Sequence, residues 1–231
     1  MKKATIIILI FLSFWSCDSG IFSGKLKEGV INYKIEYLDD ENEKPIISML
    51  PTEMTIKFKK GYSIQEVEGW MGIFRMAGIR HIKDDTKTAL LKILADKYLY
   101  SIKGGQDAFG FDPMKDKKIV YSKETKLIAG YKCKKANVTI KNKKGDEQKM
   151  LVYYTEELKA PYPDEDFDIG GIVLQTEILL GDEDDDEALT QITTAIEVKK
   201  GKVKKKEYAI PAGATKIEKE KFMQMLGGSA E

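Results

Sequence analysis

The chain has 231 residues, of which 42% are hydrophobic and 32% are charged. This length is ample for one domain with its own core, and the hydrophobic fraction excludes a chain that is disordered throughout. The 38 basic and 37 acidic side chains give a net charge of +1, so the chain as a whole has no field that would attract nucleic acid. We therefore expect a folded protein without a nucleic-acid partner.

The N-terminus has the pattern of a secretory leader. Lys2 and Lys3 precede an apolar run over residues 4–15, which only Thr5 and Ser13 interrupt. A charged stub followed by a short apolar core is typical of a signal peptide, and this run is too short to span a bilayer comfortably. The sequence therefore predicts an exported protein whose leader is removed.

Cys17 follows the apolar core directly, and this position resembles the lipobox of bacterial lipoproteins. Ser16 fits that box, whereas Phe14 and Trp15 are bulkier than its usual residues. The resemblance implies a leader of residues 1–16, cleavage before Cys17, lipidation of Cys17 and a tether that extends to residue 28. Two or three acyl chains hold a protein stably in a leaflet. The alternative is an ordinary signal peptide that ends at a chance cysteine.

We expect the mature protein to be anchored in the outer membrane and to face the periplasm. Asp18 follows the cysteine, and in some bacteria that residue retains lipoproteins in the inner membrane instead. Loss of residues 1–16 removes two lysines and leaves 36 basic against 37 acidic side chains, so the mature chain is also close to neutral.

From residue 29 onward, apolar and polar side chains alternate with a period of two. Ile31, Tyr33 and Ile35 alternate with polar neighbours, which is typical of a strand with one buried face. Tight turns are expected at residues 60–61 and 84–85. The pattern predicts strands over residues 31–37, 54–58, 62–67, 73–83, 87–93 and 97–103.

The second half of the chain continues in the same way. The longest predicted strand needs a bulge near Gly130 or residues 134–135. Residues 200–201 are a hairpin signal that leads into the last strand. The strands are expected over residues 118–122, 127–140, 150–154, 172–179, 191–199 and 203–210.

One short C-terminal helix is expected over residues 216–226, after a Pro-Ala-Gly break. The strands follow one another through short turns, without the long crossovers that parallel sheets need. The sequence therefore predicts a mostly β fold, a single antiparallel domain over residues 29–231 in which a curved meander curls on itself. Its apolar face must be covered by closure of the sheet, by a helix or by a ligand.

Two short segments carry a resemblance to known families, IAGYKCKKA at residues 128–136 and VYYTEEL at residues 152–158. Both are similar to a signature shared by a domain-of-unknown-function family of exported bacterial lipoproteins and by the related GLPGLI family. Residues 168–174, DIGGIVL, lack the Leu-Pro of the GLPGLI hallmark, which favours the first family. The resemblance implies a LolA/LolB-like half-barrel, a curved sheet that shelters acyl chains under a helical plug, and no catalytic residue.

Cys133 is the one cysteine left after lipidation of Cys17, so no intramolecular disulfide is expected. Its lysine neighbours would lower the pKa of the thiol if they approached it, but an isolated cysteine in a strand is more often a small buried hydrophobe. The single histidine, His81, cannot supply a His-based metal site. We predict neither a metal nor another cofactor.

An apolar segment between two predicted strands holds the candidate ligand-binding residues. Methionine and aromatic side chains adapt to flexible ligands, so this segment is a candidate for the mouth of an apolar cavity. A hairpin whose side chains cap the core is the more common reason for such a segment. The candidate residues are Trp70, Met71, Ile73, Phe74 and Met76.

Two charged segments have both a functional and a structural interpretation. The six acidic residues 182–187 are candidates for calcium binding, yet they lack the spaced ligands of an EF-hand, and such runs usually form solvated loops. With the acidic residues 164–166 they also suggest glycosidase chemistry, for which a loop is a poor support. The six lysines in residues 199–206 either face anionic headgroups near the anchor or protect an edge strand from aggregation.

We therefore expect a non-enzymatic periplasmic lipoprotein that binds a lipid or another apolar ligand within its curved sheet. The alternative is an envelope scaffold or protein-interaction module without a small ligand. Both would reach the membrane through the lipid anchor. A third hypothesis, from a different class, is an enzyme that uses the acidic segments.

Overall fold

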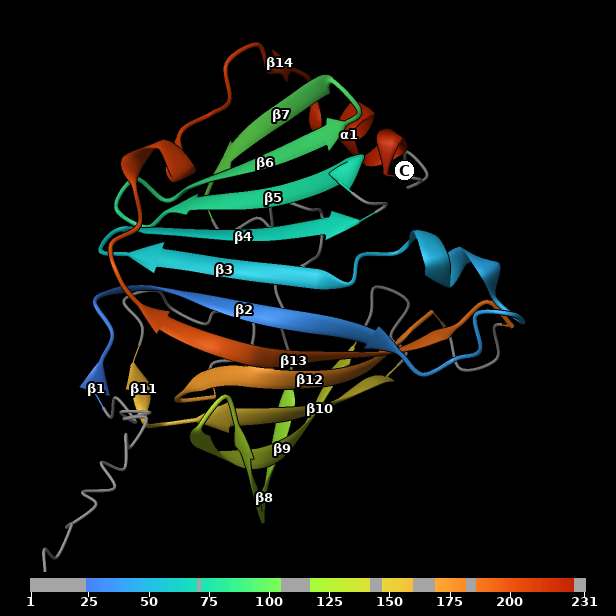
Figure 1. Ribbon diagram of the computed structural model, residues 1–231, viewed down its shortest axis with the longest axis vertical. Helices are drawn as coiled ribbons and strands as arrows, with labels where there is room; N and C mark the ends of the chain where they lie inside the picture. The colour runs from blue at the N-terminus through green and yellow to red at the C-terminus, as the bar shows by residue number, and fades with distance from the viewer. Residues whose placement is uncertain are drawn as a thin grey trace, which may run out of the picture.

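The computed structural model describes residues 24–69, 72–104, 117–141, 147–159, 169–181 and 186–226. The fold is mostly β, as expected, with one short α-helix near the C-terminus (Figure 1). The helical elements are η1 (Pro45–Met49), η3 (Lys205–Tyr208) and α1 (Lys219–Met225). The strands are β1 (Gly24–Lys25), β2 (Glu28–Tyr37), β3 (Glu53–Lys59), β4 (Tyr62–Gly69), β5 (Phe74–His81), β6 (Thr86–Ile93), β7 (Asp96–Lys103), β8 (Lys118–Ile128), β9 (Tyr131–Lys141), β10 (Glu147–Thr155), β11 (Leu158–Lys159), β12 (Ile172–Leu180), β13 (Leu189–Lys200) and β14 (Thr215–Lys216).

Twelve of these strands form one long open sheet, in the order β14-β7-β6-β5-β4-β3-β2-β13-β12-β10-β9-β8. Strands β2 to β7 run outward from the centre in chain order, and strands β8 to β13 return from the opposite edge until β13 pairs with β2. Neighbouring strands are antiparallel except β14, which runs parallel to β7. The predicted meander is therefore correct within each half, whereas the join between the halves is a long-range pair.

The alternation in the sequence matches the burial of the side chains. In β2, Ile31, Tyr33 and Ile35 are buried, whereas Lys34 and Glu36 are exposed. Successive side chains of a strand point to opposite faces, so the period of two marks which face is packed.

The predicted strand over residues 127–140 is wrong, because the chain turns within it. Strand β8 ends at Ile128 and β9 begins at Tyr131, and these two residues pair. Ala129 and Gly130 between them have φ values of 48° and 84°, as a two-residue hairpin turn requires. A positive φ is uncommon for alanine, so the sequence did not signal this turn.

The predicted strand over residues 203–210 is also wrong. After β13 the chain forms η3, and it lies against a face of the sheet instead of extending it. The side chains of Val203 and Tyr208 are buried against Ile64, Ala77 and Ile79.

Three register shifts bend the sheet. In β8, Ser122, Lys123 and Glu124 lie opposite the single residue Lys135 of β9. The other shifts lie between β13 and β2 and between β10 and β12. Extra residues increase the local twist of a strand, and β8 and β9 are turned out of the plane of β3 to β5 (Figure 1). The expected curvature of the sheet is confirmed.

Both faces of the sheet are covered around β5 and β6. Residues that pair directly across antiparallel strands point to the same side, and successive residues point to opposite sides. Met76 pairs with Leu91 on the side that α1 covers, whereas Ala77 pairs with Leu90 on the side that η3 covers. A third cluster joins β2 and β3 to the second half of the sheet, and its fully buried side chains include Ile31, Phe58, Cys133, Leu158 and Leu174.

Candidate functional site

Helix α1 covers an apolar patch of the sheet, which we call the α1 face. The Phe222 side chain is fully buried there, and its ring packs edge-on against the Tyr100 ring with 4.7 Å between the ring centroids. A helix of seven residues is too short to be stable alone, so its packing on the sheet holds it in place. The sheet residues of the α1 face are Phe74, Ala89, Leu91, Ile93, Tyr100 and Ile102.

Three of the five predicted ligand-binding residues lie in the described part of the chain, at or beside the α1 face. Phe74 belongs to that face and packs against its cluster. Met76 points to the same side of the sheet and is half-buried. Ile73 is half-buried directly before β5. Trp70 and Met71 lie outside the described residues, and ligand binding by the segment stays a prediction.

The cover of the α1 face is held by apolar contacts of the helix and by backbone pairing of the segment before it. Met223, Met225 and Leu226 are half-buried around Phe222, and no side chain caps the N-terminus of the helix. The preceding segment is tied to β7 by the short parallel strand β14 and by a backbone hydrogen bond of 2.9 Å from Ile217 N to the Leu99 oxygen. Burying one phenylalanine contributes about 2 kcal/mol, which an apolar ligand of similar buried area can match.

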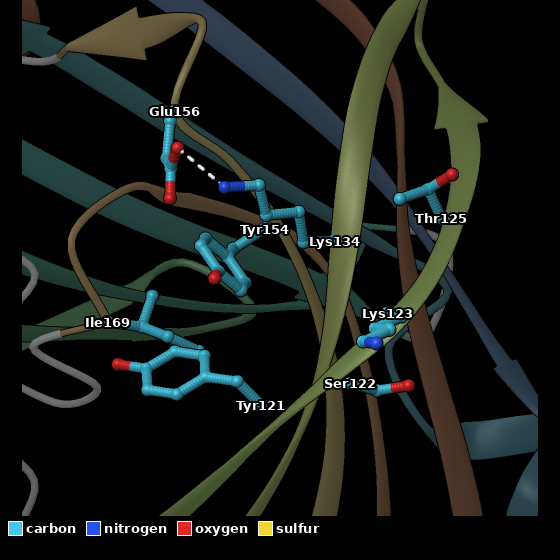
Figure 2. Close-up of a pocket in the computed structure, with 8 residues that line it drawn as sticks. All are labelled: Tyr121, Ser122, Lys123, Thr125, Lys134, Tyr154, Glu156 and Ile169. Atoms are coloured by element: carbon cyan, nitrogen blue, oxygen red, sulfur yellow. Dashed lines mark hydrogen bonds and ion pairs between the residues drawn. The ribbon is translucent and has the colours of Figure 1, made fainter.

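A second site is an open pocket of about 560 Å³ beside β8. Its residues come from the bulged part of β8, from β9, from the end of β10 and from the segment before β12. Figure 2 shows the rings of Tyr121 and Tyr154 next to Ile169, with Lys134 and Glu156 beyond them. The full lining is Tyr121, Ser122, Lys123, Thr125, Lys134, Tyr154, Glu156 and Ile169.

The pocket combines an aromatic wall with an ion pair. The Tyr121 and Tyr154 rings are 6.1 Å apart in a T-shaped arrangement, and Tyr154 is buried. Lys134 Nζ lies 2.8 Å from Glu156 Oε2, and about half of each of these side chains is exposed. The hydrogen bond to Glu156 raises the pKa of Lys134, and burial raises the pKa of Tyr154. Such a lining suits a peptide or another amphipathic group.

Glu124 fixes the bulge that shapes this pocket. Lys135 Nζ lies 2.9 Å from its Oε2, and the Tyr153 hydroxyl donates a hydrogen bond to its Oε1. Lys126 Nζ lies 3.9 Å from the centre of the Tyr153 ring. The hydrogen bond raises the pKa of Tyr153 to about 12 and lowers the pKa of Glu124. Three strands thus hold the bulge in place.

Strand β8 is also the last strand of the long sheet, and it carries exposed apolar side chains. Val120, Tyr121 and Leu127 are 50%, 58% and 75% exposed. Edge strands can accept an added strand from another chain, and bulges interrupt such pairing. Two short unbulged stretches remain, at residues 118–121 and 125–128.

Cys133 lies in the core of the sheet. Its side chain is fully buried, and the thiol donates a hydrogen bond of 3.5 Å to the Tyr131 carbonyl. Burial raises the pKa of the thiol to about 11, and the thiolate is the nucleophilic form of cysteine. The prediction of a small buried hydrophobe is confirmed.

The acidic segments lie largely outside the described residues, which omit 160–168 and 182–185. Asp186 and Glu187 are exposed. His81 packs edge-on against Tyr62, with 4.5 Å between the ring centroids. Across the described ranges, no group of three or more His, Cys, Asp or Glu side chains is arranged to hold a metal ion. In the same ranges, no helix has the length and hydropathy needed to cross a bilayer.

The pocket beside β8 was not predicted. The sequence predicted a strand for Tyr121 and another for Tyr154. The two rings meet only because β9 pairs with both β8 and β10, and because β8 bulges next to Tyr121. The adjacent apolar residues Val120 and Tyr121 were the signal that the sequence offered, since strict alternation would bury only one of them.

No family model matches the sequence, and a search of curated proteins found no match. Among solved structures, the crystal structure of MucB matches with 10% identity and a TM-score of 0.35, over 83% of this chain and 60% of the MucB chain. MucB in complex with MucA(peri) matches with 10% identity and a TM-score of 0.32, over 81% of this chain and 56% of that chain. An outer membrane lipoprotein-sorting protein domain from Vibrio parahaemolyticus matches with 8% identity and a TM-score of 0.23, over 81% and 91%.

This chain thus spans about three fifths of the length of the MucB chain that it matches. With TM-scores below 0.5, these similarities carry no argument about function. The resemblance to the two exported-protein families stays a prediction.

Proposed function

We propose that the protein is a non-enzymatic lipoprotein, anchored through Cys17 in the outer membrane and facing the periplasm, that binds a lipid or another apolar ligand on the α1 face. One observation carries the proposal. The cover of that face is a single seven-residue helix that inserts the fully buried side chain of Phe222. The hydrophobic effect is not directional, so an acyl chain that fills the same space would be stabilised in the same way.

The side chains around Phe222 suit a flexible ligand. Met76, Met223 and Met225 are half-buried at the border of the α1 face. Methionine side chains are unbranched and polarisable, and they repack around ligands of different shape. In this proposal α1 moves aside and Phe74, which was predicted from the sequence as a ligand residue, contacts the bound chain.

Native mass spectrometry tests the proposal directly. The Cys17→Ser protein would be purified from the periplasm under mild conditions, and we expect one bound lipid per chain. Met76→Gln should lower the bound fraction about tenfold, because the ligand would bury an amide without a hydrogen-bond partner. The matched control is Leu127→Gln, the same kind of change at a side chain that is 75% exposed on β8.

Two outcomes contradict this proposal. The first is a protein that is empty after purification and stays empty after incubation with envelope phospholipids and palmitic acid. The second is an equal loss of lipid in Met76→Gln and Leu127→Gln, which would remove the α1 face as the binding site.

A protein-interaction role without a small ligand is the second candidate function. It is favoured by the edge of β8, where Val120 and Leu127 are exposed beside a pocket with an aromatic wall. An extended segment of an envelope protein would add a strand to this edge and place one side chain in the pocket.

Site-specific photo-cross-linking in cells tests the second candidate. A photoreactive amino acid at Val120 should capture one dominant protein partner. The same group at Ile196, which is 60% exposed in the central strand β13, should capture none. Cross-links of equal pattern from both positions would contradict recognition by the β8 edge.

A further inference from the structure

The strands in the middle of the long sheet have two ends, and these two ends carry opposite charge, although the chain as a whole is almost neutral. At one end lie the turn between β3 and β4 and the segment that follows β13. Lys59 pairs with Glu28, Lys200 pairs with Gly29, and the Val203 amide donates a hydrogen bond to Glu28. The start of β2 therefore gathers the lysines of this end, which we call the lysine end: Lys59, Lys60, Lys199, Lys200, Lys202, Lys204, Lys205 and Lys206.

The opposite end of the sheet is acidic. It contains the connection from β2 to β3, with Asp39, Asp40, Glu41 and Glu43, and the described residues Asp186 and Glu187 that precede β13. The Thr190 amide donates a hydrogen bond of 2.8 Å to Asp39, so these two connections lie together. The hydrogen bond from Thr190 lowers the pKa of Asp39.

Most of the described acidic groups next to these lysines are engaged. Glu207 lies 3.0 Å from Lys57, Glu197 lies 2.6 Å from Lys199, and Glu28 accepts the Val203 amide. Asp84 and Asp85 in the turn between β5 and β6 are exposed at the same end of the strands. Glu156 and Glu157 follow β10 at the same end of the strands, and Glu156 lies 2.8 Å from Lys134. Around η3, the described lysines outnumber the described carboxylates.

Protection of a sheet edge does not account for these lysines. Lysines on edge strands prevent pairing with other chains, but β13 is a central strand between β2 and β12. Lys202 precedes η3 in a segment that is not a strand, and Lys205 and Lys206 lie within η3. Lysines at these positions therefore do not protect an edge strand.

The chain also leaves the sheet at the lysine end. Strand β1 begins at Gly24, directly before the start of β2, and Figure 1 shows β1 on the same side as the arrowheads of β3 and β13. Cys17 lies seven positions before Gly24. A chain of that length spans at most about 25 Å, so an anchor at Cys17 would hold the lysine end close to the bilayer.

We propose that the lysine end is the membrane-facing surface of the protein and docks on anionic phospholipid headgroups. The orientation of the protein at the membrane rests on the proposed anchor at Cys17. The attraction between the lysine end and anionic headgroups does not depend on that anchor. Charges further away than about 8 Å are largely screened at physiological salt. The acidic end lies about 30 Å away, the length of a ten-residue strand such as β2, so it does not cancel the attraction.

Vesicle binding of the unlipidated Cys17→Ser protein tests the proposal without the anchor. We expect at least tenfold stronger binding to vesicles of 70% phosphatidylcholine and 30% phosphatidylglycerol than to pure phosphatidylcholine. Binding should fall at least tenfold between 0.1 M and 0.5 M NaCl, because salt screens the lysines. A variant with Lys202, Lys204, Lys205 and Lys206 changed to Gln should bind the anionic vesicles at least tenfold more weakly.

The matched control changes four other exposed lysines to Gln, namely Lys34, Lys118, Lys149 and Lys221. It has the same net charge as the first variant and should bind within twofold of the parent. Equal losses in both variants, no preference for anionic vesicles, or binding to heparin without binding to vesicles would each overturn the proposal. Because the tested protein carries no acyl chain, failure here is distinct from failure of lipidation or of apolar-ligand binding.

Discussion

The phenol hydroxyl of Tyr153 on β10 donates a hydrogen bond to the Glu124 carboxylate on β8, across the strand β9 that lies between them. Lys135 of β9 completes the link with an Nζ to Oε2 distance of 2.9 Å. The three side chains tie three strands together where β8 bulges. These three side chains therefore hold the bulged shape of the edge strand β8 and also stabilise it.

Loss of the Tyr153 hydroxyl should weaken the fold in a pH-dependent way. We expect Tyr153→Phe to lower the free energy of unfolding by about 1 kcal/mol at pH 7, because one hydrogen bond is lost while the ring stays. This hydrogen bond lowers the pKa of Glu124, so its contribution is present above the unfolded pKa and is lost as the pH falls through the folded pKa. Urea unfolding should therefore show a smaller difference between the two proteins in acid than at pH 7.

The control for this prediction is Tyr121→Phe. It removes the same hydroxyl from a ring that is 58% exposed, and it should change the free energy of unfolding by less than about 0.5 kcal/mol. A difference between Tyr153→Phe and the parent that grows in acid would argue against the network.

Cys133 should resist alkylation in the folded protein. Burial raises its pKa from 9.0 to about 11, which leaves roughly 100-fold fewer thiolates at pH 8, and the side chain is fully buried. Iodoacetamide labelling of the Cys17→Ser protein, followed by mass spectrometry, should show reaction only in denaturant. A cysteine introduced by Thr125→Cys at an exposed position should react quickly in the same sample, and equal rates at both sites would refute the buried placement.

Gly171 should not tolerate a side chain. A Cβ there would lie 2.4 Å from the Thr155 carbonyl oxygen, because the chain that enters β12 passes directly against the end of β10. We expect Gly171→Ala to lower the free energy of unfolding by about 1–3 kcal/mol through this overpacking. Gly201→Ala is the control, since nothing lies within 4 Å of its Cβ, and thermal unfolding should distinguish the two.

Truncation of Phe222 should release α1 from the sheet. We expect Phe222→Ala to cost about 3 kcal/mol locally, because the side chain is fully buried and its loss leaves a cavity against Tyr100. Hydrogen exchange should accelerate in α1 first, and a dye that binds apolar surfaces should fluoresce more strongly. Lys221→Ala changes an exposed side chain of the same helix and should have neither effect.

The strands could be predicted where a local pattern decides them. The alternation of Ile31, Tyr33 and Ile35 identified β2, and similar patterns identified the strands that follow it up to β7. Of the predicted ligand residues, Phe74 lies on the α1 face. The turn at Ala129 and Gly130 was missed because an alanine with positive φ has no signature in the sequence.

The pocket beside β8 and the lysine end could not be predicted in the same way. Lys59 and Lys200 are far apart in the chain, and they share one end of the sheet because β3 and β13 both pair with β2. The lysines of residues 199–206 were expected to flank a hairpin turn, and the structure places them at the end of the central strand β13 and in the segment that follows it.

The sequence by itself determined the β class, the inward face of most strands and the short C-terminal helix. Burial of an alternating side chain depends only on its neighbours along the same strand, so a local pattern is sufficient evidence for it. The tertiary structure alone decided that β2 pairs with β13, that α1 covers the face carrying Phe74, and that opposite charges collect at opposite ends. These features depend on contacts between residues that are distant in the chain, and no local spacing encodes them.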